Sequence, residues 1–233
     1  MSVILDFFDA GYYINLDTRV DRRVLFEQRA RAAGLPPIER FPAICPPPFP
    51  HAPREHFRLG CTLSQKAVIR LAQARGQQRI LIFEDDCTFV PSFADDFPVY
   101  VAALRALEQS TSPYANWDVC YWGGSPHPHY FQEHATCAPA GSHFVSNPGA
   151  VWGAHGYAVH ARFFEKLLRS DAYPADMTLI CVPPATRTYL MARDLLVYQD
   201  DESFSDLWGE TIRRADGNRT DYAHHVTSVH RPE

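Results

Sequence analysis

Ile80-Leu81-Ile82-Phe83-Glu84-Asp85-Asp86 is the most informative stretch of the chain for its fold. Its four consecutive apolar residues predict a short strand that is buried on both faces of a sheet. Three carboxylates follow, and clustered negative charge at the end of a buried strand is costly unless a cation or hydrogen-bond donors lie beside it. In open α/β sheets the ligand crevice lies outside the carboxyl ends of the strands. Because carboxylate oxygens suit Mg²⁺ and Mn²⁺, we expect Glu84, Asp85 and Asp86 to hold a metal ion that carries a phosphorylated substrate.

The alternative interpretation of this stretch is an acidic turn that is simply solvated, as most runs of charge are. On a regular strand Glu84 and Asp86 point to one face and Asp85 to the other. A strand end relaxes that alternation, so Asp85 stays a candidate ligand. We favour the metal site because the apolar residues before the carboxylates place them at the edge of a sheet.

Length and composition indicate one α/β domain. The chain has 233 residues, of which 46% are hydrophobic, and its formal net charge is −5. Residues 1–212 are predicted to form a single domain, and 213–233 a polar C-terminal tail. No run of Lys or Arg stands out, so the sequence disfavours nucleic acid as a partner, since a duplex-binding protein needs a basic face.

Cysteine usage and hydropathy point to a cytoplasmic protein. The six cysteines are scattered without a CxxC pair, which favours a reducing compartment and disfavours zinc. The N-terminus lacks a basic region, and Asp6 and Asp9 interrupt its apolar run, so it does not resemble a signal peptide. No apolar stretch approaches the roughly 18 residues that a membrane span needs. Without a basic amphipathic helix, we expect at most peripheral contact with the inner face of a membrane.

The first strand is predicted at 12–16, followed by a turn and a helix from about 20 to 33 that Thr18 caps and Gly34 ends. Asn15, Asp17 and Arg22, together with Arg19, therefore gather at the carboxyl end of this strand. That position suits a nucleotide base and its phosphates. Helix capping and surface ion pairs explain Asn15 and Asp17 equally well.

The helix that leads into the carboxylate strand is the clearest in the chain. The proline-rich segment 45–59 is predicted to be a surface loop, and Thr62-Leu63-Ser64-Gln65 has the pattern of a capping box that starts the helix. Gly76 ends it. A helix that feeds a buried strand is typical of a βαβ sheet.

Further elements are weaker in the sequence. We expect a helix at about 92–107, strands at 117–122, 150–159 and 195–198, and a helix around 163–168. Segment 125–147 holds four histidines without regular spacing, so a solvated loop is favoured over a metal site there.

The sequence contains no HExxH motif, no nucleophile elbow and no Walker A motif. It therefore gives no support to a protease, an esterase or a P-loop protein. Carboxylates on a divalent ion that grips a diphosphate would stabilise a departing nucleotide diphosphate. Bond breaking at a sugar C1 builds oxocarbenium character, and an acceptor hydroxyl then attacks with help from a separate carboxylate base.

Three segments carry a resemblance to a known family: Asn15-Leu16-Asp17 with Arg22, Gly60-Cys61-Thr62-Leu63-Ser64, and Phe83-Glu84-Asp85-Asp86. They resemble the signature segments of glycosyltransferase family 25, which covers bacterial lipooligosaccharide galactosyltransferases and a related domain of collagen galactosyltransferases. Further matches occur in the family's order over about residues 11 to 209, and these are Trp117-Asp118, Gly156-Tyr157, Pro174-Ala175-Asp176 and Ser205-Asp206.

The resemblance implies a GT-A-like, Rossmann-type fold with a mostly parallel sheet, a UDP-sugar donor, Mn²⁺ (or Mg²⁺), and inversion at the anomeric carbon. It implies transfer of a hexose, most often galactose, to a glycan or lipid-linked glycan in lipopolysaccharide or other surface-glycan biosynthesis. By position, Asp85 and Asp86 would touch metal and diphosphate with support from Glu84. The residues that would line the donor site are Asn15, Asp17, Arg22, Ser205 and Asp206.

Asp176 is the candidate catalytic base, because inversion needs a carboxylate opposite the leaving group. An N-cap after Pro174 explains it equally well. The chain departs from the family at Gln65, where a histidine is usual, and glutamine cannot titrate. Two alternatives therefore stay open: a transferase acting on a protein, a small molecule or a modified nucleic-acid base, and a non-catalytic nucleotide-sugar binder.

Overall fold

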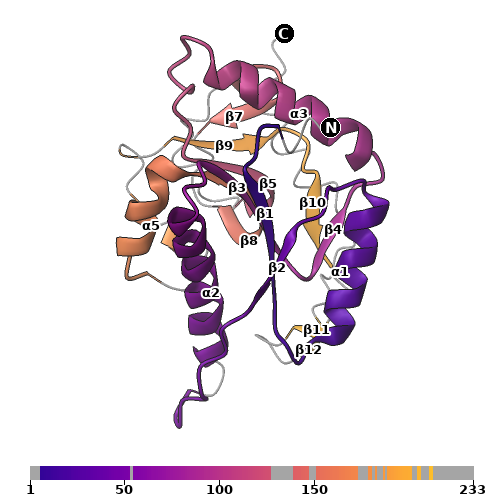
Figure 1. The fold of residues 1–233 in the computed structure, drawn as a ribbon, viewed down its shortest axis with the longest axis vertical. Coiled ribbons are helices and arrows are strands. Elements are labelled where there is room, and N and C mark those ends of the chain that lie inside the picture. The colour runs from indigo at the N-terminus through magenta and orange to yellow at the C-terminus, as the bar shows by residue number, and fades with distance from the viewer. Residues whose placement is uncertain are drawn as a thin grey trace.

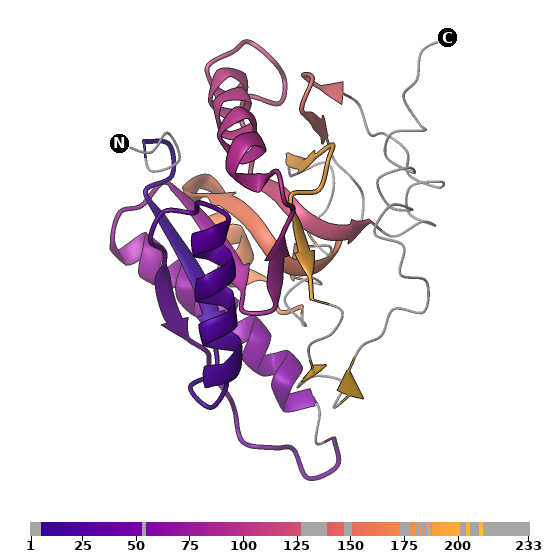
Figure 2. The same cartoon turned by 90° about the vertical axis from the view of Figure 1, so that its right-hand side faces the viewer.

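The computed structural model describes residues 6–52, 55–126, 139–146, 151–172, 178–179, 182, 186, 188–200, 204–205 and 210–211. Within them the chain forms an eight-stranded sheet with helices on both faces (Figures 1 and 2). The strand order is β2-β1-β3-β8-β5-β9-β7-β6, and every strand except β8 and β7 runs in the same direction. The predicted α/β class, with a mostly parallel central sheet flanked by helices, is confirmed.

The elements of the first half are β1 (Ala10–Asn15), α1 (Val20–Ala32), β2 (Glu39–Pro42), α2 (Glu55–Ala74), β3 (Arg79–Glu84), β4 (Cys87–Phe89) and α3 (Phe93–Glu108). Those of the second half are β5 (Val119–Pro126), β6 (Pro139–Ala140), β7 (Phe144–Ser146), β8 (Val151–His160), η1 (Ala161–Phe163), α5 (Phe164–Arg169), β9 (Tyr189–Ala192), β10 (Val197–Gln199), β11 (Phe204–Ser205) and β12 (Glu210–Thr211).

Strand β3 is buried on both faces, as its apolar run predicts. Ile80 and Ile82 belong to the apolar cluster under α2 and α5, and Leu81 and Phe83 to the cluster under α1 and α3. All four side chains are at most 1% exposed. Because β3 is enclosed by both helical layers, its polar end is the natural place for a site.

The carboxyl ends of β1, β2 and β3 meet at one edge of the sheet. Strand β1 pairs in parallel with β2 and with β3, and Ile14 lies opposite Glu84. The chain therefore leaves β1 and β3 at the same level, which brings Asn15 next to the carboxylate turn. Helices α1 and α2 both begin at this edge (Figure 1).

The helix starts differ from the predictions. Arg19, not Thr18, is the N-cap residue of α1, and no side chain caps it. Helix α2 begins at Glu55, and the hydroxyls of Thr62 and Ser64 bond back to the carbonyls of Arg58 and Gly60 within it. The predicted capping box is therefore wrong. A hydroxyl can satisfy a carbonyl one turn back as well as a free helix end, and the two uses share one sequence pattern.

A short antiparallel ribbon lies beside the edge of the sheet where the carboxyl ends of β1, β2 and β3 meet. Strand β4 follows the carboxylate turn directly and pairs with β10, so that Gln199 lies opposite Cys87 (Figure 2). The strand expected at 195–198 is thus found, but its partner β4 was missed, and so was β9. Within the predicted loop 125–147, strands β6 and β7 pair with each other, and β7 also pairs with β9.

No helix within the described residues has the length and hydropathy to cross a membrane.

Candidate functional site

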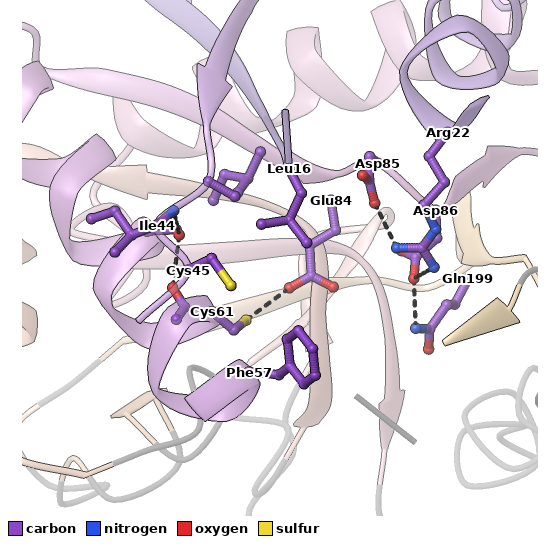
Figure 3. A pocket seen from close by; sticks show the side chains of 14 residues that line it. Leu16, Arg22, Ile44, Cys45, Phe57, Cys61, Glu84, Asp85, Asp86 and Gln199 are labelled. Atoms are coloured by element: carbon purple, nitrogen blue, oxygen red, sulfur yellow. Dashed lines mark hydrogen bonds and ion pairs between the residues drawn. The ribbon is translucent and has the colours of Figure 1, made fainter. Parts of the chain in front are cut away.

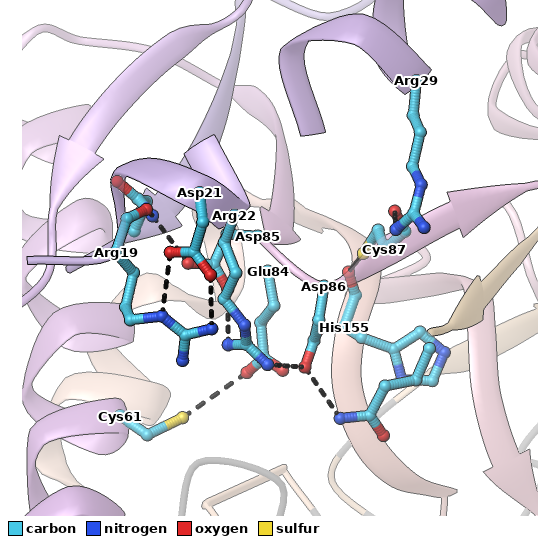
Figure 4. A network of polar contacts seen from close by, with 12 residues as sticks. Arg19, Asp21, Arg22, Arg29, Cys61, Glu84, Asp85, Asp86, Cys87 and His155 are labelled. Atoms are coloured by element: carbon cyan, nitrogen blue, oxygen red, sulfur yellow. Dashed lines mark hydrogen bonds and ion pairs between the residues drawn. The ribbon is translucent and has the colours of Figure 1, made fainter. Parts of the chain in front are cut away.

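The site is built around the turn that follows β3. Asp85 and Asp86 lie in this turn and are each 7% exposed. Asp85 accepts hydrogen bonds from Asn15 Nδ2 at 2.7 Å and from Arg22 Nη1 at 2.9 Å. Asp86 Oδ2 accepts from Arg22 Nη2 at 3.3 Å and from Gln199 Nε2 at 3.0 Å. Two buried carboxylates thus share one guanidinium and two amides (Figure 4).

Arg22 reaches the turn from the first turn of α1. Its guanidinium side chain is 12% exposed, and its two terminal nitrogens contact different carboxylates. This fork geometry is what distinguishes arginine from lysine in anion recognition. The sequence places Arg22 at the carboxyl end of the first strand, and in the structure its guanidinium contacts the carboxylate turn after β3. Its role in binding a nucleotide stays a prediction.

Asn15 ties three segments together. Its amide nitrogen donates to Asp85 and to the carbonyl of Arg19, and its oxygen accepts from Arg40 Nε at 2.9 Å. Asp17, by contrast, is exposed and pairs with Arg40 at 2.5 Å. Asn15 is therefore a buried member of the site, whereas Asp17 lies in a surface ion pair beside it.

Glu84 points away from Asp85 and Asp86. It lies near α2, where Cys61 Sγ and Gln65 Nε2 each donate to its Oε1 at 3.4 Å (Figure 3). The expected pairing of Glu84 and Asp86 on one face does not occur, because the strand ends at Glu84 and the chain turns immediately. The three carboxylates therefore belong to two neighbouring hydrogen-bond groups. Asp85 and Asp86 contact Arg22, and Glu84 contacts residues of α2.

Gln65 occupies the position where a histidine was expected from the resemblance. It is buried, donates to Glu84, and accepts from the Tyr157 hydroxyl at 2.6 Å. Burial raises the pKa of Tyr157 well above its ordinary value, so this hydroxyl stays protonated and donates. Gln65 therefore links the β8 strand to Glu84 as a fixed hydrogen-bond bridge.

Burial also acts on Asp85. It raises the pKa of this carboxyl to about 6, and the repulsion of Asp86 adds to the effect, while Arg22 and the Asn15 hydrogen bond oppose it. One guanidinium therefore does not balance two buried carboxylates.

A pocket of about 180 Å³ opens beside the turn. Its polar wall includes Arg22, Glu84, Asp85, Asp86 and Gln199. Its apolar wall includes Leu16, Ile44 and Phe57, with the thiols of Cys45 and Cys61 between them (Figure 3). The pocket can therefore receive a ligand that carries both charge and a planar or apolar group.

Gly60 allows the apolar wall to form. A Cβ at this position would come within 2.5 Å of the Ile44 carbonyl oxygen. Ser64 fixes the same loop, since its hydroxyl accepts a hydrogen bond from the Ile44 amide at 2.8 Å. The Gly60–Ser64 segment thus positions the loop that lines the pocket.

Two site residues have no counterpart in the sequence predictions. Gln199 follows the last predicted strand, and its approach to Asp86 depends on the β4–β10 pairing. His155 is buried beside the turn, and its carbonyl accepts from Cys87 Sγ (Figure 4). A Cβ at Gly123 or Gly153 would lie within 2.9 Å of its ring, so these glycines make room for it. No local sequence signal identifies either residue.

Some predicted site residues are not placed. Asp176 and Asp206 lie outside the described residues. Ser205 belongs to β11, which pairs with β12, and its side chain is not described. Of the histidines in the predicted loop, His143 is described, and it stacks edge-on against Tyr100.

The turn has features that fit a divalent cation. Asp86 Oδ1 is buried and accepts no hydrogen bond from any described residue. The donors are carboxylate oxygens, which hard cations prefer. Within the described residues, however, no group of three or more His, Cys, Asp or Glu side chains is arranged to hold a metal. A bound ion would therefore need ligands besides Asp85 and Asp86, which a diphosphate and water can supply.

Comparison with known proteins gives only distant likenesses. No family model matches the chain, and no curated protein matches it. The chain is similar to a glycosyltransferase involved in the glycosylation of the major capsid of PBCV-1, with 11% identity and a TM-score of 0.41 over 78% of this chain and 79% of that one. It is also similar to mannose-1-phosphate geranyltransferase from Thermus thermophilus, with 11% identity and a TM-score of 0.39 over 78% of this chain and 72% of that one.

Proposed function

We propose that this chain is a metal-dependent glycosyltransferase, which moves a sugar from a nucleotide-sugar donor to an acceptor hydroxyl. One observation carries the proposal: the buried pair Asp85 and Asp86 meets Arg22 at the carboxyl edge of the sheet, beside a pocket with an apolar wall. A sugar nucleotide offers a matching set of groups, namely a diphosphate, a planar base and a sugar.

Each part of the site has a role in this proposal. Asp85 and Asp86 would hold the divalent ion, which supplies charge stabilisation for the departing nucleotide diphosphate when bound. Arg22 would bind the diphosphate with its two-pronged guanidinium. Asn15 orients Asp85, and the apolar wall at Leu16 and Phe57 would cover the base.

The finer assignment rests on the family-25-like segments. They support UDP as the nucleotide, a hexose such as galactose as the sugar, Mn²⁺ or Mg²⁺ as the ion, and inversion at the anomeric carbon. Asp176 is the proposed base, and Ser205 and Asp206 are proposed to contact the donor together with Asp17. A glycan or lipid-linked glycan of a surface polysaccharide is the proposed acceptor.

A second candidate function is a nucleotide-sugar binder without turnover. Gln65 favours it, because this buried amide replaces a titratable residue of the resembled family and holds Glu84 by hydrogen bonds alone. Transfer to a protein, a small molecule or a modified nucleic-acid base is a further variant of the first proposal.

The test is UDP release from UDP-galactose and other UDP-sugars, with Mn²⁺ and with a chelator. We expect slow metal-dependent hydrolysis that Asp86→Ala lowers by about 100-fold or more, since it removes a ligand that acts on developing charge. Asp95→Ala is the matched control, because Asp95 is exposed in the first turn of α3.

Two other outcomes decide against turnover. UDP-sugar binding without release, even when candidate glycan acceptors are present, supports the binder. Failure to bind any nucleotide sugar overturns both candidates.

A further inference from the structure

Arg22 stands where the proposed divalent ion would stand. Its Nη1 lies 2.9 Å from Asp85 Oδ1, and its Nη2 lies 3.3 Å from Asp86 Oδ2. The two carboxylate side chains are each 9% exposed, so this ion pair is largely shielded from water. Figure 4 shows the guanidinium between the two acidic side chains.

The guanidinium and an ion cannot share this position. An ion bound to both carboxylates would lie about 2.0–2.6 Å from the same oxygens. Two positive groups on the same oxygens would also repel each other strongly where water is excluded. Occupation of the carboxylates by Arg22 and by a cation is therefore mutually exclusive.

Arg22 has another place to go. It lines the pocket as well as the carboxylate turn, and its long side chain starts from the first turn of α1. A phosphate group in the pocket offers oxygens that suit the guanidinium fork. Asp86 Oδ1, which is buried and accepts no hydrogen bond within the described part of the chain, then gives the turn one unused ligand atom for a cation.

We propose that Arg22 is an internal counter-ion of the ligand-free site, which offsets part of the charge of Asp85 and Asp86 until a diphosphate draws it away and a divalent cation takes its place. This inference rests on the proposed function, since that function supplies the diphosphate and the cation. It predicts that cation alone binds weakly, because it must first displace Arg22. It also predicts that anion and cation strengthen each other's binding, as coupled sites must.

The test is titration of the nucleotide-free protein with Mn²⁺ alone, followed by calorimetry or by the loss of the free-ion electron paramagnetic resonance signal. Arg22→Met removes the competing charge at similar length, so we expect Mn²⁺ to bind about tenfold more tightly or better than to the unchanged protein. Arg22→Lys keeps one charge without the fork and should fall between them.

The matched control is Arg23→Met. Arg23 is the next residue of α1, is about half exposed and pairs with Glu27 rather than with the turn. The Arg23→Met substitution removes the same charge from the same helix. Because Arg23 does not contact the carboxylate turn, the affinity for Mn²⁺ should stay unchanged. Repeating the titrations at higher salt screens long-range charge, and the difference between Arg22→Met and Arg23→Met should persist.

Unchanged or weaker Mn²⁺ binding by Arg22→Met overturns the inference, as does the absence of Mn²⁺ binding from all the proteins. Should Arg22→Met not fold, Arg22→Lys alone still decides, because tighter binding than in the unchanged protein is required of it. Failure here is separable from failure of the proposed function. Turnover of UDP-sugars with no effect of Arg22 on Mn²⁺ affinity rejects only the inference, and the effect without turnover rejects only the function.

Discussion

At the scale of single residues, the site depends on which polar atom faces which. Asn15 shows this best, because its amide nitrogen lies 2.7 Å from a carboxylate oxygen of Asp85. An aspartate has the same shape but only acceptor oxygens. The choice of amide over carboxylate at this position therefore determines whether the turn is stable.

We predict that Asn15→Asp destabilises the protein by about 2 kcal/mol or more at pH 7, since it replaces a buried hydrogen bond by repulsion between carboxylates. The neighbouring Asp85 carboxylate raises the pKa of the introduced carboxyl group in the folded state above its value in the unfolded state. The folded state then binds more protons in the window above about pH 4, so stability is recovered as the pH falls.

Urea unfolding at pH 7 and pH 5 measures this effect. Asn116→Asp is the matched control, because Asn116 is exposed and its side-chain oxygen accepts from Arg162, which an aspartate would also satisfy. An Asn15→Asp protein as stable as its parent at pH 7 would contradict the assigned hydrogen bond.

Residues whose neighbours are local or are set by the sheet could be predicted from the sequence. Four apolar residues ending in carboxylates were enough to predict β3, and the parallel order then brought Asn15 and Arg22 to Asp85. The direction of the Glu84 side chain could not be predicted, because a turn breaks the alternation that a strand enforces. The contact of Gln199 with Asp86 could not be predicted either, because it needs a strand pair between segments far apart in the chain.

At the scale of elements, the junction of β8 with η1 carries a pH-sensitive group. Burial, with a further contribution from Arg162, lowers the pKa of His160 to about 4. The ring packs edge-on against Trp117, and its Nδ1 accepts from the Arg162 amide. His160 is thus neutral in the folded protein at a pH where the unfolded chain is already charged.

This difference in charge determines how the stability of the folded protein changes with pH. Between about pH 6.5 and 4 the unfolded state binds more protons than the folded state, so stability decreases as the pH falls. We predict that His160→Asn, which can still cap the following turn, flattens the melting-temperature profile in this window. His51→Asn, at an exposed position, should leave the profile unchanged. A parental profile that is already flat there would rule out this role.

The β4–β10 ribbon is tied to helix α1 by an ion pair. Arg29 Nη2 lies 2.6 Å from Asp200 Oδ2, and the Asp200 amide donates to the Asp86 carbonyl at 2.8 Å. The Asp200 side chain is only 12% exposed. Asp200 therefore connects the end of β10 with helix α1 through its side chain and with the carboxylate turn through its backbone amide.

We predict that Arg29→Met costs about 1–3 kcal/mol of unfolding free energy, between the values for exposed and buried pairs. Arg31→Met, on the exposed side of the same helix, should cost little. A double-mutant cycle with Asp200→Asn isolates the pair term, and a coupling energy of zero would show that the contact does not stabilise the ribbon.

At the scale of the whole molecule, the three layers separate the four thiols that the structure describes into two classes. Cys87 and Cys120 are fully buried between the sheet and the layer of α1 and α3, and burial raises the pKa of both thiols well above the ordinary value. Cys45 is exposed and Cys61 is half-buried, and both line the pocket beside the carboxylate turn that follows β3. The layering therefore predicts which thiols a reagent can reach.

We predict that N-ethylmaleimide modifies Cys45 and Cys61 in the folded protein, while Cys87 and Cys120 react only after denaturation, because the thiolate is the nucleophile and must be accessible. UDP with Mn²⁺ should slow the modification of Cys61 and Cys45 if the nucleotide fills the pocket they line. Peptide mass mapping after timed exposure distinguishes the four positions. Rapid labelling of Cys120 would contradict the packing of the sheet against α1 and α3, whereas labelling of Cys61 that ignores saturating UDP would place the nucleotide elsewhere and remove the pocket from the proposed function.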